Sequence, residues 1–142
     1  MKLLLAVDDS KYSDAATRAV MSEYPTLGTE VQVLNVVDLA LPIPTSYADG
    51  FRQESLKQGQ ELVQHTGQKL SQAGFKVQTA VEEGDPKSKI LDHAATWKAD
   101  VIVIGSHGRT GIKHFLLGSV SEAVVRHAPC SVEVVRMNLA HA

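Results

Sequence analysis

The stretch Val101-Ile102-Val103-Ile104-Gly105-Ser106-His107-Gly108 joins four consecutive β-branched apolar residues to a turn bounded by glycines. A short apolar run without polar alternation is typical of a strand buried on both faces, as in a parallel sheet. Glycines directly after such a strand let the backbone approach a ligand closely. The stretch therefore predicts a buried strand of an α/β sheet with a candidate binding loop at its carboxyl end.

Four further short segments rich in leucine or valine predict strands: Leu3–Val7, Val31–Val37, Val77–Val81 and Val132–Val135. Apolar spacing and capping residues predict helices between them: one capped by Ser13 and ending before Pro25, one over Phe51–Ala73, one from Pro86 with Asp85 as N-cap, and one over Ser119–His127. Residues 38–50 contain two prolines and no helical period, which predicts a loop. The fold class that follows is α/β, with one open, mostly parallel five-stranded sheet and helices on both faces.

Length and composition fit one globular domain over residues 1–142. The chain has 142 residues, of which 44% are hydrophobic and 21% charged, and this excludes wholesale disorder. The net charge of −2 does not favour a nucleic-acid partner, and no apolar stretch has the ~20 residues of a membrane-spanning helix. The single cysteine, Cys130, excludes an internal disulfide and favours a reducing compartment, so we expect a soluble, cytoplasmic protein.

Charge is distributed unevenly along the chain. Residues 1–104 carry 10 basic and 14 acidic side chains, whereas residues 105–142 carry 4 basic and 2 acidic ones. A locally positive end on an acidic chain favours a small anionic ligand over a polymer. Chance in so short a segment gives the same asymmetry, so charge alone leaves both interpretations open.

The connection after the buried strand is a candidate phosphate site. Gly105 and Gly108 follow the strand, and Gly118-Ser119 opens the next predicted helix. Glycine loops and helix N-termini present backbone N–H groups to anions. The glycine spacing matches neither the Walker loop nor the dinucleotide-binding fingerprint. The alternative is a plain loop before a helix that starts with a capping box, Ser119-Val120-Ser121-Glu122.

The spacing Gly105-x2-Gly108-x9-Gly118-Ser119 resembles that of ATP-binding members of the universal stress protein family. Four other stretches are similar to that family: Ala6–Ser10, Asn35–Asp38, Gly84–Pro86 and His127–Val132. The resemblance extends over nearly the whole chain. It implies the Rossmann-like fold of the adenine nucleotide alpha hydrolases.

The resemblance also implies roles for individual residues. The triphosphate motif is matched by Gly105, Gly108, Gly118 and Ser119, and further phosphate contacts are implied for Val120 and Ser121. Asp8 matches the acid that holds the ribose, and Ala6 and Val7 line the same pocket. Val36 matches the position whose backbone reads the adenine edge, and Ile104 lies against the nucleoside. The positive charge near Arg109 and Lys113 suits a polyphosphate.

The implied ligand is ATP, with ADP, AMP or a cyclic nucleotide as alternatives and Mg²⁺ accompanying a triphosphate; no protein ligands for a metal are predicted. The implied function is a nucleotide-dependent regulator of the stress response without efficient turnover. The alternative is a slow ATPase or nucleotidyl-transfer enzyme on the same fold, with His107 as a candidate acid or base. Relatives pair their last strand across a twofold axis, so Val132–Val135 predicts a homodimer.

Two other functions fit the sequence less well. Asp8-Asp9 resembles the acidic pair of phosphorylated receiver domains. That class needs an aspartate at the end of the third strand and a lysine after the last strand, where this chain has Glu82-Glu83-Gly84 and Arg136. An interaction module that binds no nucleotide is disfavoured by the intact glycine spacing.

Overall fold

The computed structural model describes residues 1–39, 45–108 and 117–137. Within these residues, five strands and four helices alternate: β1 (Lys2–Ala6), α1 (Lys11–Glu23), β2 (Glu30–Val37), α2 (Thr45–Gln72), β3 (Lys76–Glu83), α3 (Pro86–Trp97), β4 (Val101–Gly105), α4 (Ser119–His127) and β5 (Ser131–Val135). The strands form one sheet in the order β3-β2-β1-β4-β5, and every neighbouring pair is parallel. The predicted fold class is confirmed.

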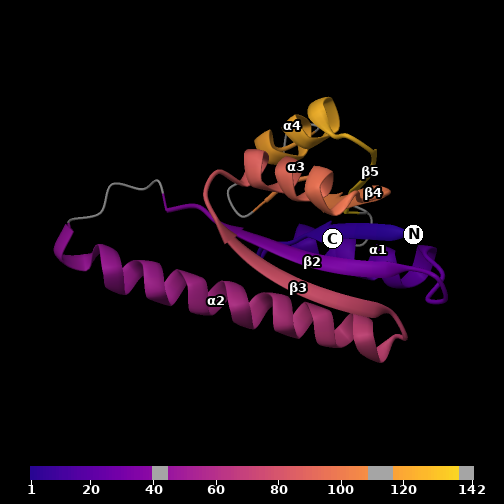
Figure 1. The fold of residues 1–142 in the computed structure, drawn as a ribbon, viewed down its shortest axis with the longest axis horizontal. Coiled ribbons are helices and arrows are strands. Elements are labelled where there is room, and N and C mark those ends of the chain that lie inside the picture. The colour runs from indigo at the N-terminus through magenta and orange to yellow at the C-terminus, as the bar shows by residue number, and fades with distance from the viewer. Residues whose placement is uncertain (40–44, 109–116, 138–142) are drawn as a thin grey trace.

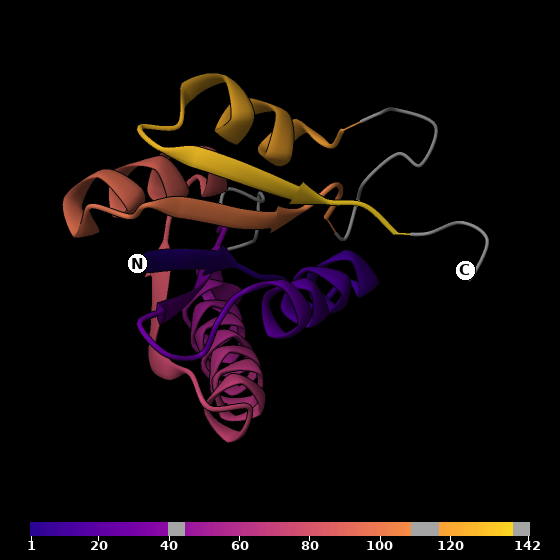
Figure 2. The ribbon, with the colours of Figure 1, turned by 90° about the vertical axis from the view of Figure 1, so that its right-hand side faces the viewer.

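Two apolar cores lie on opposite faces of the sheet. One lies between the sheet and helices α1 and α2, with Leu5 and Val33 fully buried. The other lies under α3 and α4, with Leu4 and Ile102 fully buried. Figure 2 shows these two helix pairs on either side of the strands. Because side chains alternate along a strand, the leucines of β1 supply both cores, which explains why the run has no polar residue.

Some predicted helix boundaries are confirmed and others are wrong. Asp85 caps α3, accepting a hydrogen bond from the Ser88 backbone N–H, and proline occupies the first turn as predicted. The N-cap of α1 is Ser10 instead of Ser13, which lies inside the helix. The N-cap of α4 is Gly118 and makes no side-chain capping hydrogen bond, so the capping box proposed from Ser119 does not form.

Helix α2 begins at Thr45, so the prediction of a loop over 38–50 and of a helix start at Phe51 is wrong for residues 45–50. Its 28 residues correspond to ~42 Å at ~1.5 Å per residue, whereas the eight-residue strands below it span ~26 Å. The first turns therefore extend past the carboxyl ends of β2 and β3 (Figure 1). An ion pair between Arg52 and Glu83 connects this extension to the end of β3.

Helix α2 packs closely on the sheet because two of its buried residues are glycines. A Cβ on Gly59 would lie 2.7 Å from Asn35 Oδ1, and a Cβ on Gly67 would lie 3.0 Å from Thr79 Cγ2. Sequence alone assigns these glycines a helix-propensity cost of roughly 1 kcal/mol each relative to alanine. The structure shows what the glycines allow in return: without Cβ atoms at these two positions, α2 lies in close contact with strands β2 and β3.

Strand β5 lies at one edge of the sheet, next to β4. Its Glu133 side chain accepts a 2.6 Å hydrogen bond from Tyr24 Oη, just beyond the end of α1. Burial first, and then this hydrogen bond, raise the pKa of Tyr24 above its usual value. The contact therefore links the edge strand to α1.

Candidate functional site

The winding of the sheet changes direction between β1 and β4. Strands β2 and β3 follow β1 on one side, and β4 and β5 lie on the other. In such sheets ligands bind beyond the carboxyl ends of the strands at this point. Here Asp8 lies just past the end of β1, and the loop Gly105–Gly108 begins at the end of β4. Two of the predicted site segments are therefore neighbours.

Asp8 is held in a fixed orientation by the start of α1. Its Oδ1 accepts hydrogen bonds from the Ser10 N–H at 2.9 Å and from Ser13 Oγ at 3.0 Å. Ser13 Oγ also accepts from the Asp8 N–H at 2.8 Å. The other carboxylate oxygen lies toward β4, because a Cβ on Gly108 would be 2.9 Å from Oδ2. The carboxylate thus lies between β1 and the glycine loop, as a group that receives hydroxyl donors should.

The glycine loop is organised around Ser106, which is only 2% exposed. Its N–H donates to Val135 O of β5 at 2.9 Å, and its carbonyl accepts from the Gly118 N–H at 2.7 Å. The Ser121 hydroxyl donates to the same carbonyl at 2.8 Å. Ser106 therefore joins the end of β4 to the edge strand and to the start of α4.

The N-terminus of α4 consequently lies beside the carboxyl end of β4. The first N–H groups of any helix have no intrahelical acceptor, and the N-cap residue here, Gly118, has no side chain to accept from them. Such N–H groups, together with the helix dipole, favour anions, which makes the start of α4 a candidate anion site. Ser119 at the first helical position is exposed, whereas Ser121 is buried. A Cβ on Gly118 would lie 3.2 Å from His107 Cα, so a side chain there would press on the loop.

The apolar members of the predicted site lie on the same edge of the sheet. Ala6 and Ile104 are paired neighbours in β1 and β4 and belong to the core under α3 and α4. Val36, near the end of β2, packs against that core and is half-buried. Asn35 Nδ2 donates to Val7 O at 2.9 Å, which ties the end of β1 to β2. Ala6, Ile104 and Val36 therefore lie near the carboxyl ends of three neighbouring strands.

The structure adds four contributors to this edge that the sequence did not single out for the site. Ser10 and Ser13 orient Asp8, Asn35 fixes Val7, and Ser106 is the hub of the loop. Ser106 directly follows β4 and Asn35 lies near the end of β2, whereas Ser10 and Ser13 lie at the start of α1, so the four share no sequence pattern that could have identified them. Arg109 and Lys113 lie outside the described residues.

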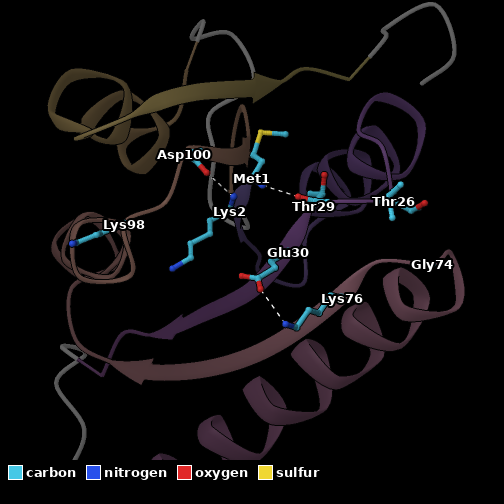
Figure 3. A pocket seen from close by; sticks show the side chains of 11 residues that line it. Met1, Lys2, Thr26, Thr29, Glu30, Gly74, Lys76, Lys98 and Asp100 are labelled. Carbon is cyan, nitrogen blue, oxygen red and sulfur yellow. Dashed lines mark hydrogen bonds and ion pairs between the residues drawn. The ribbon is translucent and has the colours of Figure 1, made fainter.

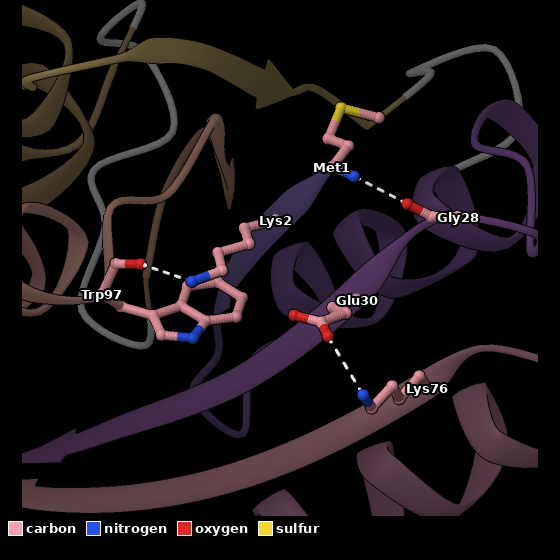
Figure 4. Close-up of polar contacts among 6 residues, drawn as sticks. All are labelled: Met1, Lys2, Gly28, Glu30, Lys76 and Trp97. Carbon is pink, nitrogen blue, oxygen red and sulfur yellow. Dashed lines mark hydrogen bonds and ion pairs between the residues drawn. The ribbon is translucent and has the colours of Figure 1, made fainter.

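A cavity of about 780 Å³ lies at the opposite, amino edge of the sheet. Figure 3 shows one pair of charged side chains there, with Lys76 Nζ 3.1 Å from Glu30 Oε1, and the Asp100 carboxylate accepting from the Lys2 backbone N–H at 2.7 Å. Lys2 Nζ also donates to Trp97 O at 3.3 Å, and the Met1 amine donates to Gly28 O at 2.6 Å (Figure 4). Most of these polar groups contact one another, and none of the predicted site residues that the structure describes lines this cavity.

Two further searches concern metals and membranes. Within residues 1–39, 45–108 and 117–137, no three histidine, cysteine or acidic side chains are grouped so that they could hold a metal ion. Among the helices of the same residues, none combines the length and apolar character that crossing a bilayer requires.

The fold defines a doubly wound α/β protein with a candidate site at the switch point. The sequence model of the universal stress protein family matches residues 1–136, and the chain belongs to that family. Universal stress protein MJ0531 of Methanocaldococcus jannaschii is 33% identical over 138 residues, covering 95% of this chain and 81% of the relative. Universal stress protein YxiE of Bacillus subtilis is 30% identical over 145 residues, covering 95% and 98%.

Solved structures agree with this assignment. The structure of protein MJ0577 superposes with a TM-score of 0.89 at 27% identity and covers 97% of this chain and 96% of that one. A universal stress family protein of Arabidopsis thaliana with AMP bound has a TM-score of 0.77 at 20% identity, covering 99% and 94%. A universal stress protein in complex with cAMP has a TM-score of 0.66 at 20% identity, covering 96% of each chain. The latter two likenesses establish a shared fold.

Proposed function

We propose that this protein binds an adenine nucleotide, ATP in the first place, in the crevice between β1 and β4. The observation that carries the proposal is the N-terminus of α4, with glycine as its N-cap, held beside the glycine loop that also lies against Asp8. A helix N-terminus binds phosphate, and a carboxylate accepts the hydroxyl protons of a ribose. Two proteins of the same fold are described with AMP and cAMP, which supports adenine nucleotides as the ligand class.

The residues divide between the parts of the nucleotide. The phosphates lie against the backbone of the glycine loop and of the start of α4, with Ser119 adding its hydroxyl. The buried Ser121 hydroxyl donates to Ser106 O, so this side chain fixes α4 while its backbone N–H faces the phosphates. Ala6, Val7 and Ile104 line the nucleoside, and the backbone at Val36 reads the adenine edge. Mg²⁺ bound with the triphosphate neutralises phosphate charge.

The role we propose is regulation by nucleotide occupancy without efficient turnover. The histidine in the loop, His107, is 9% exposed and lies against Ser106 Oγ and the Tyr12 ring. An enclosed imidazole is poorly placed to exchange protons with a water that attacks phosphate. The single cysteine fits a reducing compartment, so we place this role in the cytoplasm.

We also propose that the protein is a homodimer that pairs through β5. This strand is at the edge of the sheet that the described residues form, and an edge strand can pair through its outer backbone groups with another chain. Sedimentation velocity at micromolar concentration should give a dimer. A monomer at that concentration would contradict the assembly.

Nucleotide binding is tested by isothermal titration with ATP and Mg²⁺. Asp8→Asn keeps an acceptor oxygen for Ser10 and Ser13 but removes the charge, so we expect affinity to fall about tenfold with little change in melting temperature. Asp92→Asn, an exposed substitution on α3, is the matched control and should bind as the wild type does. Absence of ATP binding by the wild type, or equal affinities for the two variants, would overturn the assignment.

Turnover is tested separately by mass spectrometry of the nucleotide released from freshly purified protein and after hours with Mg²⁺-ATP. The proposal expects intact ATP. Stoichiometric accumulation of ADP or AMP would favour the slow ATPase instead.

A further inference from the structure

The first turn of α1 touches both halves of the proposed nucleotide site. Ser10 and Ser13 hold the Asp8 carboxylate on the β1 side. Tyr12, between them in sequence, lies on the β4 side, since a Cβ on Gly105 would be 2.8 Å from Tyr12 Cβ and from the Tyr12 carbonyl oxygen. The start of α1 is therefore packed directly against the beginning of the glycine loop.

The aromatic ring of Tyr12 also contacts the loop. Its centroid is 5.1 Å from that of the His107 imidazole, with an interplanar angle of 49°. Such tilted aromatic pairs are favourable beyond simple burial. Lys11 Nζ lies 5.9 Å from the same Tyr12 ring, so the ring packs between an exposed ammonium and the imidazole.

His107 connects the Tyr12 ring to the backbone of the glycine loop, which faces the ligand in the proposed function. Its Nδ1 is 3.0 Å from Ser106 Oγ, and its Cα is the nearest atom to a Cβ built on Gly118. Gly108, the next residue, lies against Asp8 Oδ2. A displaced imidazole would therefore shift both the loop and its spacing from α4.

We propose that Tyr12 and His107 are positioning residues, which together hold the glycine loop at the spacing that phosphate groups require. The inference rests on the proposed function for its ligand. Neither side chain touches the nucleotide in this scheme; they act through the backbone at Ser106 and Gly108. Because Asp8 keeps its hydrogen bonds to Ser10 and Ser13, we expect the contribution to fall mainly on phosphate and to leave the nucleoside residues Ala6 and Val36 nearly unaffected.

The test compares ATP, ADP and adenosine as ligands. Tyr12→Leu removes the ring contact, and the worth of an aromatic pair predicts a loss of ATP and ADP affinity between about twofold and tenfold. Adenosine affinity should remain within a factor of two. Tyr12→Phe keeps the ring and should restore wild-type affinity for all three ligands. His65→Asn, exposed on α2, is the control and should change none of them.

A double-mutant cycle with His107→Ala completes the test, since two residues acting as one unit give non-additive losses. Additive losses, an equal loss for adenosine, or failure of Tyr12→Phe to restore binding would each overturn the inference. If the wild type binds no nucleotide, the proposed function fails but the positioning role is still measurable by hydrogen exchange. Tyr12→Leu should then speed exchange of the Ser106 and Gly108 amides, and unchanged exchange would refute it.

Discussion

Replacing Gly59 with alanine should destabilise the protein, although alanine is the better helix former. Gly59 lies in the buried face of α2. The added methyl group would be 2.7 Å from Asn35 Oδ1, 3.2 Å from Val81 Cγ1 and 3.4 Å from Val37 Cγ2. The first distance is shorter than any ordinary contact, so either the helix or the Asn35 amide must move.

Three contributions set the magnitude. Alanine gains about 1 kcal/mol in helix propensity. Overpacking of a close contact costs about 1–3 kcal/mol. Displacing Asn35 also breaks its 2.9 Å hydrogen bond to Val7 O, and a buried polar group left without its partner costs about 1–3 kcal/mol. We therefore expect a net loss of about 1–5 kcal/mol in the free energy of unfolding.

The assay is urea unfolding followed by circular dichroism and by fluorescence of Trp97, the one tryptophan of the chain. Gly50→Ala is the matched control, because Gly50 lies in the same helix and a Cβ there meets nothing within 4 Å. Gly50→Ala should raise the free energy of unfolding by about 0.5–1 kcal/mol. If Gly59→Ala stabilises as much as Gly50→Ala, close packing of α2 is not the reason for the glycine.

Three further substitutions probe local contacts. Asp85→Ala should cost about 1 kcal/mol in chemical denaturation, because it removes the α3 cap that accepts from the Ser88 N–H, whereas Asp85→Asn should cost less. Tyr24→Phe should lower the free energy of unfolding by about 1 kcal/mol, since the Glu133 carboxylate loses its 2.6 Å donor; no change in the urea midpoint would contradict this. A hydrogen bond to Glu133, and then repulsion from it, raise the pKa of Glu23 above 4.5, so its stabilising contribution is present at lower pH and is lost as the pH rises through the folded-state pKa. The melting temperature should fall less over that pH range for Glu23→Gln than for the wild type. Parallel pH profiles of the melting temperature would contradict the interaction between Glu23 and Glu133.

The strands were predictable because each carries its own signal. The apolar runs of β1 and β4 can only be buried on both faces, which puts them at the centre of a parallel sheet. The start of α2 carries no such signal, because its first turns extend past the sheet and bury no apolar stripe; Tyr47 there is 69% exposed. The Arg52–Glu83 ion pair that connects this segment to β3 joins residues far apart in sequence.

The site was predictable only where chemistry depends on residue type. Glycine spacing and Asp8 single out two segments of the proposed site, and the structure places them next to each other at the carboxyl ends of β1 and β4. Ser106 connects β4 to β5 and to α4 through its backbone N–H and carbonyl groups. Nearly every residue type has these groups, so no sequence pattern reveals this role. The sequence alone does not show which of Ser10 and Ser13 caps α1: Ser10 Oγ accepts from the Ser13 N–H, whereas the Ser13 hydroxyl donates to Asp8.

The backbone of Ser106 also connects the two proposed interactions of the protein. Its N–H donates to Val135 O at the end of β5, and its carbonyl accepts from the Gly118 N–H at the start of α4. Pairing of β5 across a dimer would fix the first contact, and phosphate on α4 would fix the second. Because linkage between binding equilibria is reciprocal, nucleotide should tighten the dimer by the same factor as dimerisation tightens nucleotide binding.

We expect that factor to be at least about fivefold, the lower end of common coupling energies. Sedimentation across a concentration series, with and without saturating ATP, measures the dimer dissociation constant directly. Adenosine is the discriminating ligand, because it fills the nucleoside pocket without loading the start of α4 and should leave the dimer unchanged. Equal dissociation constants with and without bound ATP would mean that the Ser106 hydrogen bonds join the two sites in space without coupling them in free energy.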